Sequence, residues 1–367
     1  MKTLQLVPAM EQGGVERGVV EMNRVLVGEG WENVVVSAGG RLADRIAADG
    51  GRHVELDVKS KNPLTYFRRA ARLRRLLEAE RPDVVCAHSR VPAWLFVRAN
   101  RALGIPWITF AHGANSVSPY SRVMTYGDLT VTPSGYVADY LRRAYGIAGE
   151  RLRVIPRAID RARFDPDRLD RGFVAACRRD WRTEGRFVVM AVGRITQLKG
   201  YDVLLREMAK LPARFMLVLV GEAEERRRDV ERGLRRLADE LRLGDRVVFA
   251  GNQGRVAECL SVADAVVSSN VRKPEAFGRS MAEALAMGRP VVAKAFGGAL
   301  DIVRDGVDGV LVADDAFAPA ILKVSEMSFG DLRGDALRRF SFEDMAARSL
   351  AVYRELAGRR AGAGKAR

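Results

Sequence analysis

Residues 187–205 read FVVMAVGRITQLKGYDVLL and contain the clearest indication of the fold class. The stretch opens with a run of apolar residues, passes through a loop that holds two glycines and two cations, and continues as a helical pattern. A buried strand, a glycine loop and a helix in this order are typical of the repeating unit of a parallel sheet. The stretch therefore predicts an α/β domain whose ligands bind at the carboxyl ends of the strands.

The same alternation of strand and helix extends along nearly the whole chain. The segments between the predicted strands are amphipathic, and in one of them Val15, Val19, Met22 and Leu26 share a helical face. Strand patterns occur at residues 4–8, 33–38, 53–58, 84–88, 107–111, 129–132 and 152–155, and then at 187–192, 215–220, 247–250, 265–268, 290–293 and 309–312. Seven strands followed by six predict two doubly wound, Rossmann-like α/β domains that face a central cleft.

A charged connector separates the two sets of strands. Residues 160–171 are rich in arginine and aspartate, contain a proline and lack a strand pattern. We place one domain at 1–165 and the other at 166–341, and expect a helix at 342–357 to pack back on the first domain. The tail at 358–367 has no apolar residue larger than alanine, which predicts disorder.

The composition limits the classes of function. A hydrophobic content of 48% is ordinary for a globular protein, and it excludes a disordered or fibrous chain. The excess of 61 Lys and Arg over 46 Asp and Glu, a net charge of +15, favours an anionic partner such as a nucleotide, a phosphorylated sugar, a nucleic acid or an acidic membrane face. Cys86, Cys177 and Cys259 form no C-x-x-C pair, and no segment resembles a signal peptide or a membrane span. We expect a cytoplasmic protein.

Two cations flank the loop that follows the strand at 187–192. Lys199 lies at the start of a helix, where the helix dipole disfavours a positive charge by up to about 1 kcal/mol. An anion held jointly by Arg194, Lys199 and the helix amides would offset that cost, and a diphosphate has the charge and reach to do so. The alternative is two solvated surface cations. Gly13 and Gly14 after the first strand would also suit an approaching anion, but a plain tight turn explains them equally well.

The most informative segment is residues 273–290, KPEAFGRSMAEALAMGRP. Glu275 lies on a loop after a predicted strand, a helix begins near Phe277 and Gly278, and the helix ends at Gly288. Glu283 falls inside this helix, with the free amides around Gly278 between the two acids. Such a layout suits an elongated ligand that has hydroxyl groups at both ends and phosphates in the middle. A loop solubiliser and an ordinary helix surface residue are the alternatives for Glu275 and Glu283.

In this combination the chain resembles the retaining glycosyltransferases of family 4, which have the two-domain GT-B fold. The resemblance covers almost the entire chain, and EAFGRS at 275–280 is similar to bacterial members that build the lipopolysaccharide core or lipid-linked glycans. Ala276 and Ala158 depart from residues that are frequent in the family. Besides the motifs already quoted, the resemblance rests on AHG at 111–113 and VIPRAID at 154–160.

The resemblance implies a role for each position. Arg194 and Lys199 would hold the donor diphosphate and neutralise the departing nucleoside diphosphate, and Glu275 would bind the transferred sugar. His112 would lie near the reacting carbon, so the implied catalytic set is His112, Arg194, Lys199 and Glu275. Glu283 would bind the ribose and Asn252 would border the base. The implied donor-binding set is completed by Gly13, Gly14, Ala276, Phe277 and Gly278.

The implied reaction moves a sugar from a nucleoside diphosphate sugar to a hydroxyl of a glycan or glycolipid, with retention of configuration. In the family, an oxygen of the leaving diphosphate is thought to accept the proton of the acceptor. No metal and no other cofactor is expected, because Arg194 and Lys199 supply the positive charge. The other two histidines, His53 and His88, flank or end predicted strands and are interpreted as structural.

Residues 63–77 predict a basic helix. Its inward face would carry Phe67, Ala70, Leu73, Leu76 and Leu77, and its outer face Arg68, Arg69, Arg72 and Arg75. A solvated arginine-rich surface is one interpretation. The other is docking on an anionic leaflet, where each surface cation adds about 1 kcal/mol, so that the protein would be peripheral on the inner face of the cytoplasmic membrane.

Three further functions compete with glycosyl transfer. A nucleotide-sugar epimerase of the same fold would convert the donor without an acceptor. A nucleic-acid-binding protein is suggested by the charge alone, but only 7% of residues are aromatic and no recognition motif is present, so we expect no nucleic-acid partner. A non-catalytic sugar-binding protein would normally be exported. The sequence leaves the sugar, the base and the acceptor open.

Overall fold

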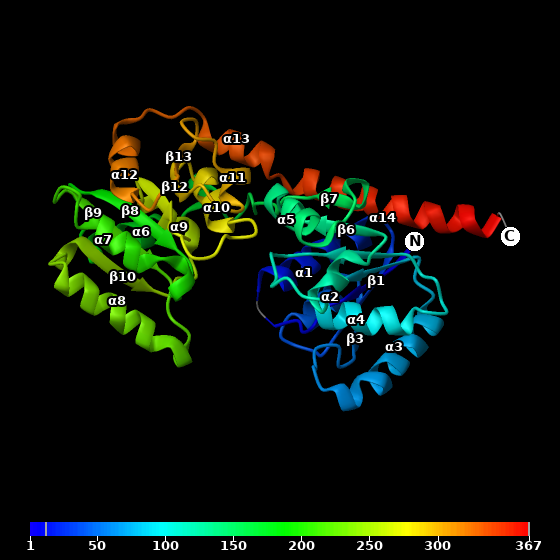
Figure 1. Ribbon diagram of the computed structural model, residues 1–367. Helices are drawn as coiled ribbons and strands as arrows, with labels where there is room; N and C mark the ends of the chain where they lie inside the picture. Colours follow the sequence, from blue (N-terminus) through cyan, green and yellow to red (C-terminus); the bar gives the residue numbers. More distant parts are fainter. Residues whose placement is uncertain (12, 366–367) are drawn as a thin grey trace. The chain divides into compact units, whose positions relative to one another are not determined.

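The computed structural model describes residues 1–11 and 13–365 and divides into two compact units (Figure 1). Unit 1 comprises Met1–Pro156 and Glu343–Arg367, and unit 2 comprises Arg157–Phe342. The boundary expected after residue 165 is therefore too late. Ile159 and Phe164 are buried in the hydrophobic core of unit 2, so the connector belongs to that unit.

Unit 1 contains a seven-stranded parallel sheet in the order β3-β2-β1-β4-β5-β6-β7. Every strand overlaps a stretch that the sequence predicts. The central strands β1, β2, β4, β5 and β6 are largely buried, which is why they can be recognised from short apolar runs, whereas β3 contains no buried residue. Their bounds are β1 Lys2–Leu6, β2 Glu32–Ser37, β3 Arg52–Glu55, β4 Val84–Ala87, β5 Trp107–Phe110, β6 Leu129–Thr132 and β7 Leu152–Val154.

Helices cover both faces of this sheet (Figure 1). On one face, α3 (Tyr66–Glu80) and α4 (Arg90–Ala99) pack against β1, β2 and β4. On the other face, α1 (Gly14–Gly28) and the C-terminal α14 (Phe342–Lys365) share a core with β4, β5 and β6. The remaining helices of the unit are α2 Ala43–Ala48 and α5 Gly135–Tyr145.

The C-terminal helix is longer than expected. Its predicted end at residue 357 is wrong, because α14 continues to Lys365. Arginine and alanine are strong helix formers, and they outnumber the glycines in this segment. Residues 366–367 of the expected disordered tail lie outside the described residues. Among the helices of the described chain, none combines the length and the hydropathy that crossing a membrane requires.

The basic helix is α3, and the structure corrects two of its predicted positions. Arg69, expected on the outer face, is only 5% exposed, whereas Phe67, expected inside, is 66% exposed. The reason is the segment before α3, which includes a short 3-10 helix at Pro63–Thr65: it folds over Arg69, whose guanidinium bonds the carbonyl of Asn62. Arg68, Arg72 and Arg75 are exposed.

Unit 2 contains a six-stranded parallel sheet in the order β10-β9-β8-β11-β12-β13. The chain runs outward from β8 to one edge and then outward from β11 to the other. The carboxyl ends of β8 and β11 therefore flank the point where the strand order reverses, which is where such sheets bind ligands. The strands are β8 Phe187–Val192, β9 Phe215–Val220, β10 Val247–Gly251, β11 Ala265–Ser268, β12 Val291–Lys294 and β13 Gly309–Val312.

Eight helices accompany the sheet of unit 2 within the described residues. Hydrophobic clusters fill both faces of the sheet, and α10 and α13 contribute to one while α7 and α12 contribute to the other. The helices are α6 Arg171–Asp180, α7 Tyr201–Met208, α8 Arg228–Glu240, α9 Val256–Val262, α10 Arg279–Ala286, α11 Ala299–Ile302, α12 Phe317–Glu326 and α13 Leu332–Arg339.

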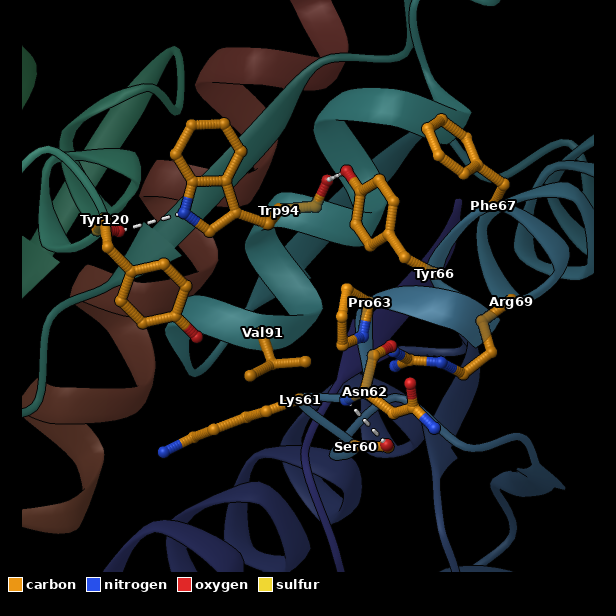
Figure 2. Close-up of a pocket in the computed structure, with 10 residues that line it drawn as sticks. All are labelled: Ser60, Lys61, Asn62, Pro63, Tyr66, Phe67, Arg69, Val91, Trp94 and Tyr120. Carbon is orange, nitrogen blue, oxygen red and sulfur yellow. Dashed lines mark hydrogen bonds between the residues drawn. The ribbon is translucent and has the colours of Figure 1, made fainter.

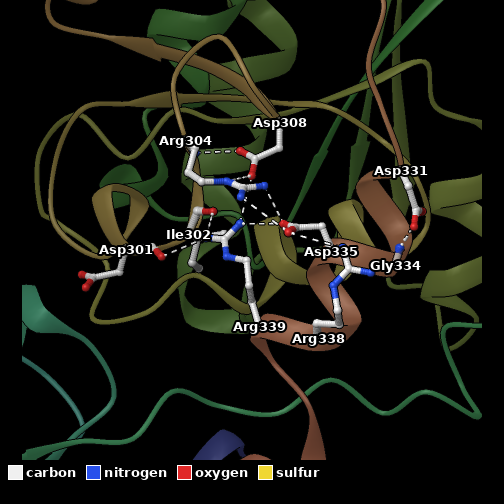
Figure 3. A network of polar contacts seen from close by, with 9 residues as sticks. All are labelled: Asp301, Ile302, Arg304, Asp308, Asp331, Gly334, Asp335, Arg338 and Arg339. Atoms are coloured by element: carbon white, nitrogen blue, oxygen red, sulfur yellow. Dashed lines mark hydrogen bonds and ion pairs between the residues drawn. The ribbon is translucent and has the colours of Figure 1, made fainter.

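A polar network ties α13 to the turn before β13 (Figure 3). The carboxylate of Asp308 is buried and accepts hydrogen bonds from Nε of Arg304 and Nη1 of Arg339, both at 2.9 Å. Arg339 also donates to the carbonyl of Ile302 at 2.6 Å, and Arg304 pairs with Asp335 at 2.5 Å. Every member of the network has a partner within it, so its role is to hold unit 2 together.

Candidate functional site

The first feature of the site is an ion pair between Lys199 and Glu275. Lys199 ends a short 3-10 helix, Gln197–Lys199, that follows β8, and Glu275 lies on the loop that follows β11. The side chains are 21% and 20% exposed, and Nδ2 of Asn270 donates to the same Glu275 oxygen at 3.1 Å. Lys199 is therefore not a solvated surface cation. The two sequence motifs meet at the carboxyl ends of two adjacent strands.

Two glycines make room for Lys199. Gly193 has φ +151°, and a Cβ there would lie 3.0 Å from Cε and 3.2 Å from Nζ of Lys199. Gly200 has φ +65°, and a Cβ there would overlap the carbonyl oxygen of Ser269. The Ser269 hydroxyl donates to the carbonyl of Lys199 at 2.8 Å. These contacts fix the loop against the end of β11, so the ammonium group has a defined position.

The amino end of α10 faces the carboxylate of Glu275. Gly278 is the N-cap of α10 with φ +99°, and a Cβ there would lie 3.0 Å from Oε2 of Glu275 and would overlap the methyl group of Met281. A helix N-terminus with nearby amides favours a negative charge. One carboxylate thus lies between an ammonium group and a helix N-terminus, which is the environment that a phosphate group would also prefer.

Arg194 reaches the other side of the same loop. Its side chain is 75% exposed, and Nη1 lies 2.6 Å from Oε1 of Glu224. Hydrogen bonds from Arg226, with the charge of Arg194 as a smaller contribution, hold the pKa of Glu224 below its usual value. A cavity of about 590 Å³ lies among these groups, and Lys199, Glu275, Arg194 and Glu224 all line it.

A second cavity of about 310 Å³ adjoins the first and shares Gly193, Arg194 and Glu224 with it. Asn252, which follows β10, lines this second cavity together with Gln253. The two cavities share Arg194, so a ligand that occupies both would pass this cation.

Two of the predicted donor-binding side chains lie elsewhere. Phe277 is buried in the core of unit 2 and packs edge-on against Phe340, with ring centroids 5.6 Å apart, so its side chain cannot contact a ligand. Glu283 lies within α10, largely buried, at 3.6 Å from Nε of Arg279, and it lines neither of the two cavities. Ala276, between Glu275 and Phe277, is half-buried.

The remaining predicted residues belong to unit 1. Gly13 is the N-cap of α1 and Gly14 is its first residue, at the carboxyl end of β1. His112 follows β5 and lies with Nε2 3.1 Å from Nδ1 of His88. The other nitrogen of His88 lies 3.0 Å from Oε1 of the buried Gln5.

The orientation of the Gln5 amide sets the tautomer of a neutral His88. Nε2 of Gln5 lies 3.2 Å from Oδ1 of Asn33, to which it donates, so the oxygen of the Gln5 amide faces His88. That oxygen can only accept, so Nε2 of a neutral His88 donates and Nδ1 accepts from Nε2 of His112. The His88 and His112 rings stack at 5.3 Å. His88 is thus a partner of the predicted site residue, and its interpretation as structural stays a prediction.

The sequence motifs do not single out several residues that line these sites. Asn270, Lys273, Glu224 and Arg226 line the larger cavity. A usable signal exists for Asn270 and Glu224, because each follows shortly after the end of a predicted strand. His88 carries the same signal, since it directly follows β4, the neighbour of β5. In the described part of the chain, no group of three or more His, Cys, Asp or Glu could hold a metal ion.

Two family models match the chain. "Glycosyltransferase Family 4" matches residues 12–163, and "Glycosyl transferases group 1" matches residues 186–327. The D-inositol 3-phosphate glycosyltransferase of Xylanimonas cellulosilytica is 33% identical over 65% of this chain and 60% of the relative. The D-inositol 3-phosphate glycosyltransferase 1 of Catenulispora acidiphila is 30% identical over 74% of this chain and 72% of the relative. The chain thus spans about three fifths to three quarters of the length of these relatives.

Solved structures share the fold over nearly the full length. A glycosyltransferase from Rickettsia africae has a TM-score of 0.87 and 26% identity, covering 97% of this chain and 98% of that one. Anabaena Alr3699/HepE in complex with UDP and glucose has a TM-score of 0.79 and 21% identity, covering 96% and 99%. Together with the two parallel sheets, these matches establish two Rossmann-like domains of the GT-B type. The chain belongs to the family 4 glycosyltransferases.

Proposed function

We propose that the protein transfers a sugar from a nucleoside diphosphate sugar to a hydroxyl group of a glycan or glycolipid, with retention of configuration. The observation that carries the proposal is the position of Lys199 and Glu275 beside the amino end of α10. A cation, a helix N-terminus and a carboxylate meet there at the carboxyl ends of β8 and β11. Two comparisons also support a nucleoside diphosphate sugar as the donor: membership of a glycosyltransferase family, and the complex of the Anabaena protein with UDP and glucose.

The donor diphosphate would bind between Arg194 and Lys199 in the larger cavity. Charge-assisted hydrogen bonds from ammonium and guanidinium groups to phosphate are roughly twice as strong as neutral ones. Because Lys199 is already paired, a phosphate would have to share or take over its contact with Glu275. Glu275 would then turn its acceptor oxygens to the hydroxyl groups of the sugar, next to the diphosphate.

The nucleoside would extend into the smaller cavity. Asn252 and Gln253 line that cavity after β10, and they offer amide donors and acceptors to a base. Glu283 remains the predicted partner of the ribose, and Phe277 would act only by fixing the backbone at Gly278. The roles predicted for His112, Gly13 and Gly14 stay predictions.

The reaction would proceed by replacement of one oxygen at the anomeric carbon by another. The acceptor hydroxyl forms a bond to that carbon, the bond to the diphosphate breaks, and the hydroxyl proton passes to the departing diphosphate on the same face. Lys199, Arg194 and the amides at Gly278 would stabilise the negative charge that develops on the leaving group. Positive side chains and amides supply this stabilisation, so we propose that no metal ion and no cofactor takes part.

The acceptor would be a membrane-linked molecule, and α3 would lie against an anionic membrane face. Arg68, Arg72 and Arg75 are exposed on this helix, and Leu64 just before it is 90% exposed. Exposed apolar side chains next to cations suit a surface that combines hydrocarbon with anionic head groups. The names of the two relatives point to a different acceptor class, inositol phosphates, which therefore belongs in the same acceptor panel.

The test is a panel of nucleoside diphosphate sugars, incubated with and without glycan, glycolipid and inositol phosphate acceptors. Release of nucleoside diphosphate that depends on an acceptor, with the anomeric configuration of the donor preserved in the product by NMR, supports the proposal. Inversion of configuration would contradict retention. Conversion of the donor to another sugar nucleotide without any acceptor would indicate an epimerase instead.

A further inference from the structure

A further cavity, with a mostly apolar wall, lies in unit 1 between α3 and α4 (Figure 2). Its volume is about 400 Å³. Aromatic and aliphatic side chains form most of the wall, and polar groups are confined to one edge, where the segment before α3 passes. The apolar wall consists of Pro63, Tyr66, Phe67, Val91, Trp94 and Tyr120, and the polar edge of Ser60, Lys61, Asn62 and Arg69.

Arg69 carries an unused hydrogen-bond donor at this edge. The side chain is 5% exposed, Nε donates to Oγ1 of Thr65 at 3.0 Å, and Nη2 donates to the carbonyl of Asn62 at 3.0 Å. Nη1 is buried and has no hydrogen-bond partner in the described part of the chain. The ion pair with Asp57 is long, with 4.0 Å between Nε and Oδ2, and Asp57 is half exposed.

A buried cation in this condition favours a bound anion. Leaving a buried donor unsatisfied costs about 1–3 kcal/mol, and more when the group is charged. A phosphate oxygen at Nη1 would satisfy the donor and add a negative charge to a guanidinium whose own ion pair is long. Lys61, exposed on the same edge, would provide a second cation for a phosphate.

The rest of the wall favours a hydrocarbon group rather than a sugar. The hydroxyl of Tyr66 donates to the carbonyl of Trp94 at 3.0 Å, and Nε1 of Trp94 donates to the carbonyl of Tyr120 at 2.9 Å. Two of the aromatic polar atoms are thereby used within the protein, and the rings are left to line the cavity with apolar surface. A saccharide would find few partners for its hydroxyl groups on such a wall.

The rim of the cavity continues this apolar surface to the outside. Phe67 both lines the cavity and is 66% exposed, and Leu64 beside it is 90% exposed. These two exposed side chains offer apolar contact area to a hydrocarbon group outside the cavity. A hydrocarbon chain of a ligand that leaves the cavity over Phe67 would remain in contact with apolar side chains.

We propose that this cavity binds a phosphate that carries a hydrocarbon chain, with the phosphate at Arg69 and Lys61 and the chain along Trp94, Tyr66 and Phe67. The bound lipid phosphate would be part of the sugar acceptor, and this assignment rests on the proposed function. The binding itself needs neither a donor nor transfer.

The experiment is calorimetric titration of the full chain, without donor, with dodecyl phosphate below its micellar concentration. Two further ligands are titrated in parallel. Dodecyl maltoside has the hydrocarbon chain without the phosphate, and inorganic phosphate has the charge without the hydrocarbon chain. We expect dodecyl phosphate to bind at least about tenfold more tightly than either, since both halves of the cavity contribute.

Two variants and a matched control localise the binding. Arg69→Met removes the buried charge and keeps much of the aliphatic stem, and we expect at least about tenfold weaker binding of dodecyl phosphate. Arg68→Met removes an exposed charge from the adjacent position of α3 and should change the affinity less than about twofold. Val91→Trp fills the cavity without touching its charges, and it should abolish binding even if Arg69→Met alters the local fold.

Several outcomes would overturn the proposal. Equal affinity for dodecyl maltoside would indicate an apolar surface without a phosphate site, and equal affinity for inorganic phosphate would indicate a site for the free ion. Equal losses in Arg69→Met and Arg68→Met, with Val91→Trp unaffected, would indicate binding by general surface charge. Absence of transfer with intact binding would refute the proposed function and leave this site standing, whereas transfer without binding would refute the site alone.

Discussion

Nδ1 of His88 lies 3.1 Å from Nε2 of His112, and the opposite nitrogen of His88 lies 3.0 Å from the side-chain oxygen of the buried Gln5. The chain of hydrogen bonds begins on β1, passes the end of β4 and finishes at the end of β5. Because the Gln5 oxygen can only accept, a neutral His88 donates to it from Nε2 and accepts at Nδ1 from Nε2 of His112. If His112 contacts the transferred sugar, His88 determines which of its nitrogens does so.

Replacing His88 by Phe keeps a ring that can stack on Phe110, 4.6 Å away in the native pair, and removes the hydrogen bond to His112. We expect the kcat for transfer to fall about tenfold, because a misplaced catalytic group loses its alignment, while the KM for the donor changes little. Steady-state kinetics measure both. His88→Gln, which can still accept a hydrogen bond, should recover part of the loss. An equal loss in both variants would reduce His88 to a structural residue.

Glu275→Gln separates the ion pair of Glu275 with Lys199 from its proposed contact with the transferred sugar. The variant removes the negative charge that pairs with Lys199 and keeps a side chain of the same size. We expect a nucleoside diphosphate alone to bind as well as before or up to about tenfold more tightly, because the ammonium group no longer has a competing partner. The additional affinity that the sugar gives to the full donor should disappear. Titration with both ligands, with Glu326→Gln at an exposed position of α12 as the control, measures the difference.

Gly278→Ala tests the amino end of α10. At φ +99° a side chain is strained, and the new methyl group would overlap Met281 and approach Glu275. We expect unit 2 to lose about 1–3 kcal/mol of unfolding free energy, because a non-glycine residue in a rare backbone conformation costs that much. Binding of a nucleoside diphosphate should weaken as well. Gly254→Ala, where an added Cβ meets nothing within 4 Å, is the control for urea unfolding and for titration.

Asp308→Asn tests the network that joins α13 to the sheet of unit 2. Removing the charge leaves Arg304 and Arg339 without their common buried partner. Breaking a buried ion pair from one side costs about 3–5 kcal/mol, so the melting temperature of unit 2 should fall by several degrees. The KM for the donor should not change. Glu326→Gln, at an exposed position of α12, should leave the melting temperature unaltered. A stable Asp308→Asn variant would contradict the structural role.

Most of the fold could be predicted from the sequence. Each predicted strand overlaps an observed one, and the central strands are the clearest, because a parallel strand buried on both faces appears as a short apolar run. The proximity of the two motifs was implied by topology, since both follow strands that end at the same edge of the sheet. What the motifs could not convey is that the two side chains contact each other.

The errors arise where burial depends on distant parts of the chain. Arg69 has the helical position of a surface residue, but the segment before α3 covers it. Phe277 follows a proposed ligand residue, but the core around Phe340 takes its ring. His88 lies at the end of a strand like many structural histidines, and only the pairing of β4 with β5 brings it to His112. Local pattern fixes none of these contacts.

Calorimetric titration of Lys199→Met with the preferred nucleoside diphosphate sugar, beside the wild-type protein, measures whether Lys199 holds the donor diphosphate. Lys323→Met, an exposed cation on α12 of the same unit, is the matched control. We expect a loss of about 10-fold to 100-fold in affinity for Lys199→Met and less than about twofold for the control, since one charge-assisted phosphate contact is worth roughly 1.5–3 kcal/mol. Equal affinities in all three proteins would contradict this role of Lys199.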